Sequence, residues 1–181
     1  KKIRFHFVNI GLIVTNIAVW LYTATWQATD VVQANSVYFS YGFIPAVASG
    51  DASLPPEMAI LPAYASYLTY SFLHGDFMHL AGNMLFLWVF GDNVEDAMGH
   101  VRYLLFYLAS GVAAALLQYV ADPGSAVPTV GASGAIAGVM GAYLLLFPKA
   151  RVDILIILII IFKVLPIPAW LLLAVWFGMQ I

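Results

Sequence analysis

Residues 101–121 read VRYLLFYLASGVAAALLQYVA, a stretch of twenty-one residues whose one charged side chain, Arg102, lies near its start. A helix needs about 20 apolar residues to cross a bilayer, so this stretch is typical of a transmembrane helix. The sequence therefore predicts four complete membrane-spanning helices and a short fifth. The other apolar runs cover residues 5–26, 77–98 and 130–147, and a last one begins near Pro166.

The composition favours the same class of protein. Of the 181 residues, 63% are hydrophobic and 9% are charged, whereas soluble domains carry about 25% charged residues. We expect an all-α, polytopic bundle of transmembrane helices, formed by residues 1–181 as a single domain in a lipid bilayer. The net charge of −2 gives no sign of a nucleic-acid partner, and the absence of cysteine excludes disulfides and thiolate metal sites.

Two segments between these runs are harder to interpret. Residues 152–162 are apolar but number eleven, too few to cross a membrane, so they are expected to lie at the interface or to extend the fifth helix. Residues 27–76 are rich in aromatic residues and proline, which is typical of a partly structured element at the level of the lipid headgroups.

The positive charges predict the orientation of the helices, because cytoplasmic loops collect Lys and Arg. The connections 27–76 and 121–129 contain none of the seven. We therefore expect a cytoplasmic N-terminus, with these two connections on the outer side. The second and fourth spans then both start from that side, so His79, Asn83 and Ser133 share one depth. The seven are Lys1, Lys2, Arg4, Arg102, Lys149, Arg151 and Lys163.

Ser133 lies in TVGASGAIAGVM, residues 129–140, where a loop gives way to a helix. A hydroxyl there lies beside unpaired backbone N–H groups at the positive end of the helix dipole, which suits the oxyanion of an acyl transfer. A second interpretation is structural. Serine is a favoured N-cap, and Gly131, Gly134 and Gly138 belong to a small-residue pattern that lets membrane helices approach closely.

His79 and Asn83 belong to HGDFMHLAGN, residues 74–83, and are four residues apart. On a helix they share one face, and both side chains can donate hydrogen bonds to an oxyanion. The alternative is that they only join helices through hydrogen bonds. His74 falls outside that face and is expected to be interfacial, nearer the water.

Other chemistries find less support. A zinc protease needs His-Glu-x-x-His, which the chain lacks. An intramembrane aspartyl protease needs two facing aspartates within its spans, but Asp92 and Asp96 lie toward the cytoplasmic end of the second span. The sequence around Ser133 also differs from the Gly-x-Ser-x-Gly elbow of the hydrolase fold. A transporter would show a line of ionisable groups or a broken helix.

With GASGAIAG (131–138), HGDFMHLAGNM (74–84) and FLWVFGDNVEDAMGHVRYLLFYLASGVAA (86–114), the chain resembles the rhomboid intramembrane serine proteases. The resemblance implies a six-helix core that hydrolyses peptide bonds in or beside the transmembrane helices of substrate proteins, without metal or cofactor. Ser133 matches the nucleophile, and His79 and Asn83 match the oxyanion-binding pair. Glu95, Gly99 and Arg102 match a structural feature of the cytoplasmic side.

The family's general base is a histidine on a sixth helix, and the sequence ends at Ile181 within the fifth. We therefore expect the full-length protein to continue and the domain to be incomplete at this C-terminus. Two alternatives stay open: an inactive relative that binds membrane helices, and a fragment without activity. The absence of a transit-like segment favours the plasma membrane, and the oligomeric state is left open.

Overall fold

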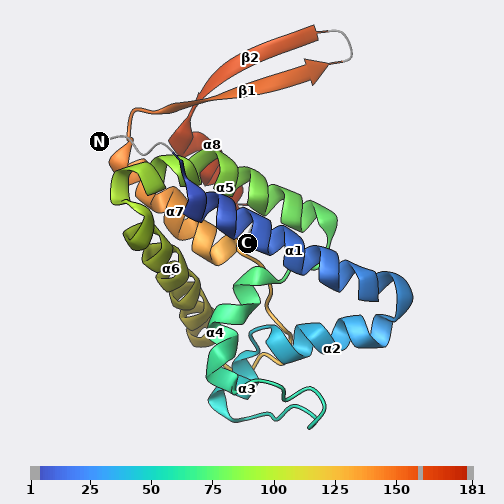
Figure 1. The fold of residues 1–181 in the computed structure, drawn as a ribbon. Helices are drawn as coiled ribbons and strands as arrows, with labels where there is room; N and C mark the ends of the chain where they lie inside the picture. The colour runs from blue at the N-terminus through green and yellow to red at the C-terminus, as the bar shows by residue number, and fades with distance from the viewer. Residues whose placement is uncertain (1–4, 159–160, 179–181) are drawn as a thin grey trace.

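The computed structural model describes residues 5–158 and 161–178, and its long helices form a bundle (Figure 1). The prediction of an all-α bundle is confirmed, apart from one two-stranded hairpin. In chain order the elements are α1 (Phe7–Thr29), α2 (Val31–Tyr41), α3 (Pro45–Ser49), η1 (Ala63–Ala65), α4 (Ser66–Thr69), η2 (Tyr70–Phe72), α5 (Phe77–Met98), α6 (His100–Ala121), α7 (Ser133–Leu146), β1 (Arg151–Leu158), β2 (Ile161–Pro168) and α8 (Ala169–Gly178).

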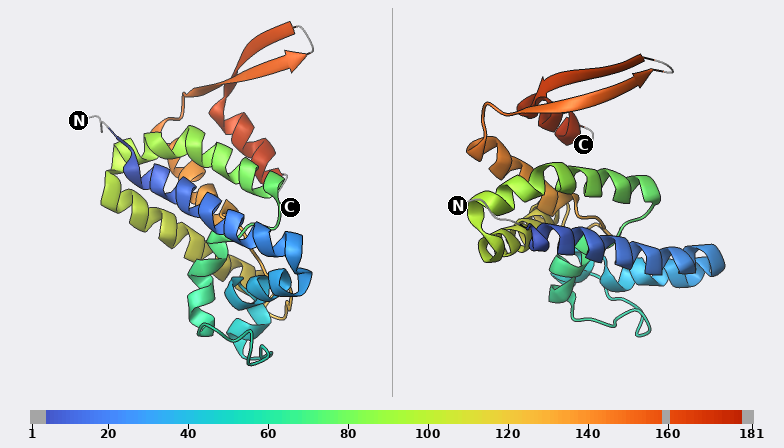
Figure 2. Two further views of the ribbon diagram at one scale, coloured as in Figure 1. Left: turned by 45° about the vertical axis from the view of Figure 1, so that its right-hand side comes forward. Right: turned by 45° about the horizontal axis from the view of Figure 1, so that its top comes forward.

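Helix α7 is the centre of the bundle. It packs against both α5 and α6, and α1 covers the other side of α5 (Figures 1 and 2). Small and apolar residues let α7 occupy this place, since a central helix must be apolar on nearly every face. Residues at the start of α7 therefore lie among other helices. The fully buried side chains of this core include Leu87, Phe90, Tyr103, Tyr107, Ile136 and Met140.

The two connections without positive charge meet at one end of the bundle, as the sequence predicted. Phe43 and Thr129 exchange two backbone hydrogen bonds of 2.8 and 3.0 Å, and the Ala46 N–H donates to the Ser125 carbonyl at 3.0 Å. Helices α2, α3 and α4 confirm that residues 27–76 are partly structured.

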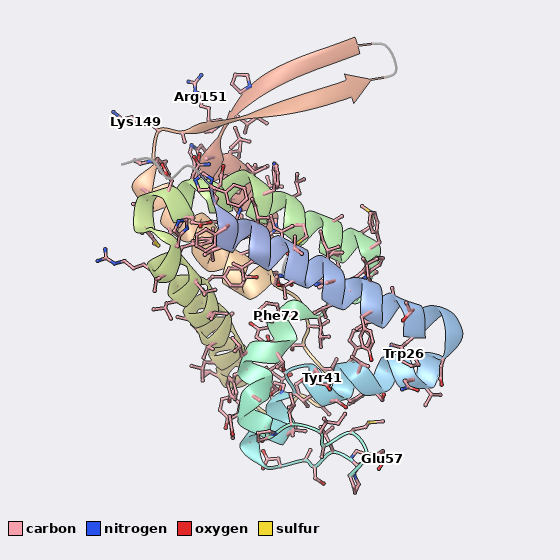
Figure 3. The ribbon with its side chains drawn as sticks, in the orientation of Figure 1. Trp26, Tyr41, Glu57, Phe72, Lys149 and Arg151 are labelled. Atoms are coloured by element: carbon pink, nitrogen blue, oxygen red, sulfur yellow. The ribbon has the colours of Figure 1, made fainter. Side chains whose placement is uncertain are left out.

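Two of the positively charged residues lie at the end of the molecule opposite to the two connections (Figure 3). Figure 3 shows Tyr41 and Glu57 at the end formed by the two connections, and Lys149 and Arg151 at the opposite end, where the hairpin begins. This distribution is the one on which the predicted orientation depends.

Among the described residues, two helices are long and apolar enough to cross a membrane: Phe7–Trp26 within α1, and α6. Helix α5 is as long as α6 but carries polar side chains, including His79 and Asn83. Helix α7 has 14 residues, about 21 Å at 1.5 Å per residue, which is short of a hydrocarbon core of about 30 Å. The fourth predicted span, 130–147, is therefore shorter than expected, and α7 starts inside the bundle.

Residues 151–158 and 161–168 correct one of the two expectations for residues 152–162, that they extend the fifth helix. They form the antiparallel hairpin β1–β2, in which Arg151 pairs with Pro168, and the helix begins only at Ala169. The stretch is rich in β-branched residues, which favour strands. Pro166 and Pro168 also oppose a helix interior, whereas a strand at the edge of a sheet tolerates proline.

Candidate active site

Ser133 is the first residue of α7, and the N-cap position belongs to Ala132. The first hydrogen bond of the helix runs from the Ile136 N–H to the Ala132 carbonyl at 3.0 Å. The N–H groups of residues 133–135 precede it, and no described side chain caps them. The predicted helix start at Ser133 is confirmed, and the alternative in which Ser133 is the N-cap is wrong. The partial positive charge at this start favours an anion.

Gly131 joins the loop before α7 to helix α5. Its φ is +123°, a conformation that side chains rarely adopt, and its N–H donates to the Tyr70 carbonyl at 3.0 Å. A Cβ on Gly131 would lie 2.6 Å from Nε2 of His79 and 3.8 Å from Nδ2 of Asn83. A side chain at residue 131 would therefore strain the backbone and displace the His79 ring. His79 and Asn83 therefore lie against the backbone two residues before Ser133.

His79 and Asn83 owe their positions to the way α5 begins. Asp76 is the N-cap, and its carboxylate accepts a hydrogen bond of 2.8 Å from the His79 N–H. The helix is therefore formed from Phe77 onward, and the predicted shared face of His79 and Asn83 is confirmed. Asn83 is 3% exposed, and His79 is half-buried.

His74 corrects the sequence analysis, which expected an interfacial side chain near the water. The imidazole is fully buried, its Nε2 lies 3.0 Å from Nδ2 of Asn83, and its ring makes a T-shaped contact with His79. The prediction treated His74 as part of the helix, but α5 begins three residues later, so the chain folds back and turns the ring inward.

The protonation state of His74 follows from this burial. The pKa of His74 is lowered to about 4, mainly by removal from water and also by the nearby His79, while the Phe72 backbone and Asp76 act in the opposite direction. The ring is therefore neutral near pH 7.

Gly134 and Gly138 hold α7 against α6. A Cβ on Gly134 would collide with Ala114 and lie 3.0 Å from the Tyr70 hydroxyl. A Cβ on Gly138 would collide with Ser110. These two glycines let α7 lie close to α6, which fixes the start of α7 relative to the rest of the bundle.

Tyr70 was not identified as a site residue from the sequence. Its hydroxyl donates to the Gly111 carbonyl on α6 at 2.8 Å, and its carbonyl receives the Gly131 N–H at 3.0 Å. It thereby ties the loop before α7 to α6. Spacing along the chain gives no signal for this role, because Tyr70 is 61 residues away from Gly131 in the sequence.

The other candidate polar residues lie at the far end of α5. Glu95 is fully buried and contacts His100, while His6 lies 3.8 Å from Asp96. Gly99, with φ +82°, ends α5 and leads into α6, which carries Arg102 in its first turn. Within residues 5–158 and 161–178, no three His, Asp or Glu side chains are grouped so that they could hold a metal ion.

The model of the rhomboid domain family matches residues 62–181, which include the whole of this site. The chain belongs to the rhomboid family. Membership identifies an integral membrane protein with a rhomboid-type function.

Individual rhomboid relatives match over shorter segments. Rhomboid protease GluP of Bacillus subtilis (strain 168) is 46% identical over 77 residues, 42% of this chain and 15% of the relative. Rhomboid-like protein 11, chloroplastic, of Arabidopsis thaliana is 42% identical over 77 residues, 42% and 27% of the two chains. Rhomboid protein 1, mitochondrial, of Saccharomyces cerevisiae is 36% identical over 104 residues, 55% and 28%. The chain thus spans less than a third of each of these relatives.

Proposed function

We propose that this rhomboid protein is an intramembrane serine endopeptidase that cleaves peptide bonds in or next to the transmembrane helices of other membrane proteins. The observation that carries the proposal is the contact of Gly131 with His79 and Asn83. Two side chains able to donate hydrogen bonds thereby lie beside an uncapped helix start, and the first residue of that helix is Ser133.

In the proposed reaction, Ser133 Oγ attacks the carbonyl carbon of the scissile peptide bond and its proton passes to a general base. The tetrahedral oxyanion accepts hydrogen bonds from His79, Asn83 and the backbone N–H of Ser133. The C–N bond then breaks, the leaving amine takes the proton from the base, and water hydrolyses the acyl-enzyme. One such oxyanion donor typically contributes about 10²- to 10³-fold to kcat.

The base belongs to a sixth helix in this proposal, as the family resemblance implies. The described histidines are used in other ways. His6 and His100 lie at the far end of α5, His79 faces Gly131, and the Nε2 of His74 is engaged by Asn83. No metal or cofactor takes part in the proposed steps.

The site's position suggests which substrates it accepts. A helix with all its backbone hydrogen bonds formed is a poor target, so we expect substrates with Gly, Ala or Pro near the boundary on the site's side. Lys149 and Arg151 at the opposite end of the bundle support a cytoplasmic N-terminus and an outward-facing site (Figure 3). We propose the plasma membrane as its location, and a single domain that this chain covers only in part.

The test is cleavage of a model transmembrane substrate by the full-length protein in lipid vesicles. We expect Ser133→Ala to lower kcat by about 10⁴-fold or more. The matched control is Ser110→Ala, because Ser110 is also a partly exposed serine of a bundle helix and lies beside Gly138. We expect it to keep kcat. Equal cleavage by Ser133→Ala and the wild type would contradict the proposal.

The same assay tests a binding role. If wild-type protein captures transmembrane helices in the vesicles but cleaves none of them, the protein is an inactive relative that recognises membrane helices. In that case Ser133→Ala leaves capture unchanged, and the serine has only the packing role of its glycine neighbours.

A further inference from the structure

A buried imidazole lies behind the proposed oxyanion pair. His74 has no exposed surface, and its Nε2 lies 3.0 Å from Nδ2 of Asn83. Its ring is 5.1 Å from the ring of His79, centroid to centroid. The backbone there is held as well, since the Tyr38 hydroxyl of α2 donates to the His74 carbonyl at 3.1 Å. Neither the resemblance nor the proposed reaction uses this histidine.

The contact constrains the Asn83 side chain. An amide nitrogen only donates, so Nε2 of His74 accepts, and one of the two Asn83 N–H groups is engaged. The carboxamide is planar, and fixing one N–H therefore fixes the direction of the other. The same nitrogen lies 3.8 Å from the Cβ position of Gly131, so it is the amide nitrogen that faces the loop before Ser133.

Without such a partner, the amide could turn by half a rotation and present its oxygen in place of its nitrogen. An oxygen acceptor facing an oxyanion would oppose the reaction instead of assisting it. The imidazole accepts at Nε2 only as the neutral tautomer that carries its proton on Nδ1. Burial keeps the ring neutral near pH 7, and the Asn83 N–H favours this tautomer because it needs an acceptor at Nε2.

We propose that His74 is a positioning residue for Asn83, which it holds with the amide nitrogen toward the reacting carbonyl. The proposal rests on the proposed function of Ser133. His74 has no exposed surface, so in this proposal it acts on the reaction through its hydrogen bond with Asn83. In metal sites, residues that orient a metal ligand typically contribute about 10- to 100-fold to activity, and we expect an effect of this size for His74.

The experiment is a double-mutant cycle in the full-length protein, with kcat and KM measured for a model transmembrane substrate. We expect His74→Phe, which keeps a planar ring but cannot accept, to lower kcat about 10- to 100-fold without changing KM. In the Asn83→Ala background the same substitution should leave kcat unchanged, because no amide remains to be oriented. His74→Gln, which can still accept a hydrogen bond, should restore part of kcat.

A merely structural role for His74 gives a different result. The two substitutions would then lower kcat independently, their effects would multiply, and His74→Gln would restore nothing, which overturns the proposal. Thermal unfolding of each variant checks the fold, and if His74→Phe does not fold, His74→Met takes its place in the cycle.

Ser133→Ala separates the two proposals in the same assay. If it cleaves as fast as the wild type, the proposed function fails and His74 has no oxyanion to serve. If it abolishes cleavage while the effects of His74→Phe and Asn83→Ala multiply, only the positioning role is wrong.

Discussion

The two ends of helix α5 both bury polar groups, but they use them differently. At the far end, the Glu95 carboxylate accepts the N–H groups of Val8 and Asn9, at 3.2 and 2.8 Å, and contacts His100. The Asn9 amide in turn accepts from Tyr103 at 2.7 Å and donates to a backbone carbonyl. These groups satisfy one another, so they join α1, α5 and α6 and are closed to a substrate.

At the site end, some hydrogen-bond donors remain available to a ligand. Asn83 uses one N–H on His74, and within the described chain no side chain caps the N–H groups at the start of α7. Polar groups inside a membrane are costly, and leaving their hydrogen bonds unmade adds to the cost. The comparison teaches that the far end of α5 uses its polar groups to stabilise the bundle, while the site end keeps hydrogen-bond donors of Asn83 and of the start of α7 available for chemistry.

The largest effect on stability is expected from Glu95→Ala. Its removal leaves the buried Asn9 N–H and the partly buried Val8 N–H at the start of α1 without their acceptor, so the free energy of unfolding should fall by about 3–5 kcal/mol. Chemical unfolding in detergent measures this, and Glu57→Ala, in an exposed loop, is the control, with a change of about 0.5 kcal/mol or less. A large loss of kcat per folded molecule would contradict the assignment of the far end to stability alone.

Asn83→Ala should have a large effect on kcat and only a small effect on stability. We expect kcat to fall by about 10²- to 10³-fold, which corresponds to about 2.7–4 kcal/mol of transition-state stabilisation. The free energy of unfolding should change by only about 1 kcal/mol, because a single hydrogen bond to His74 is lost. Steady-state kinetics and unfolding on the same preparation separate the two. If stability falls as far as in Glu95→Ala while kcat is kept, the assignment of the two ends is reversed.

The pH dependence of stability should sharpen the contrast. Burial lowers the pKa of His74 from its ordinary value of 6.5 to about 4. The folded state therefore disfavours protonation, so the contribution of His74 is complete above pH 6.5 and is lost as the pH falls toward 4. Its upper size is about 3 kcal/mol. The decline in the free energy of unfolding across this window should be smaller in His74→Met, and equal declines would contradict the burial of a neutral ring.

Two matched glycine substitutions in α7 give the smallest effects. Gly138→Ala should destabilise the protein by about 1–3 kcal/mol, since its Cβ collides with Ser110. In Gly141→Ala, nothing lies within 4 Å of the new Cβ. This substitution should therefore stabilise the protein by about 0.4–1 kcal/mol. Thermal unfolding measures both. The same sign for both would mean that the packing of α7 on α6 does not depend on Gly138.

Local sequence patterns were enough to predict the long helices and the start of α7. Length and apolarity identified the bundle, and the four-residue spacing of His79 and Asn83 gave their shared face. The hairpin was missed because a short apolar run suits a strand and a helix equally well. Its β-branched residues and Pro166 were the available signal.

The contacts that build the site could not be predicted, because they join distant segments. The approach of Gly131 to His79 depends on how the loop before α7 enters the bundle, and the Tyr70 carbonyl holds that loop. The inward turn of His74 depends on α5 starting at Phe77 rather than earlier. Such geometry is set by tertiary packing and leaves no regular spacing in the sequence.

The central claim is that Ser133 is a nucleophile, and labelling by a fluorophosphonate tests it most directly. The full-length protein is treated in lipid vesicles, and the modified residue is located by peptide mass spectrometry. The account predicts a single adduct on Ser133 that disappears in Ser133→Ala and persists in Ser110→Ala. An adduct of equal yield in Ser133→Ala, or one on another serine in the wild type, would contradict it.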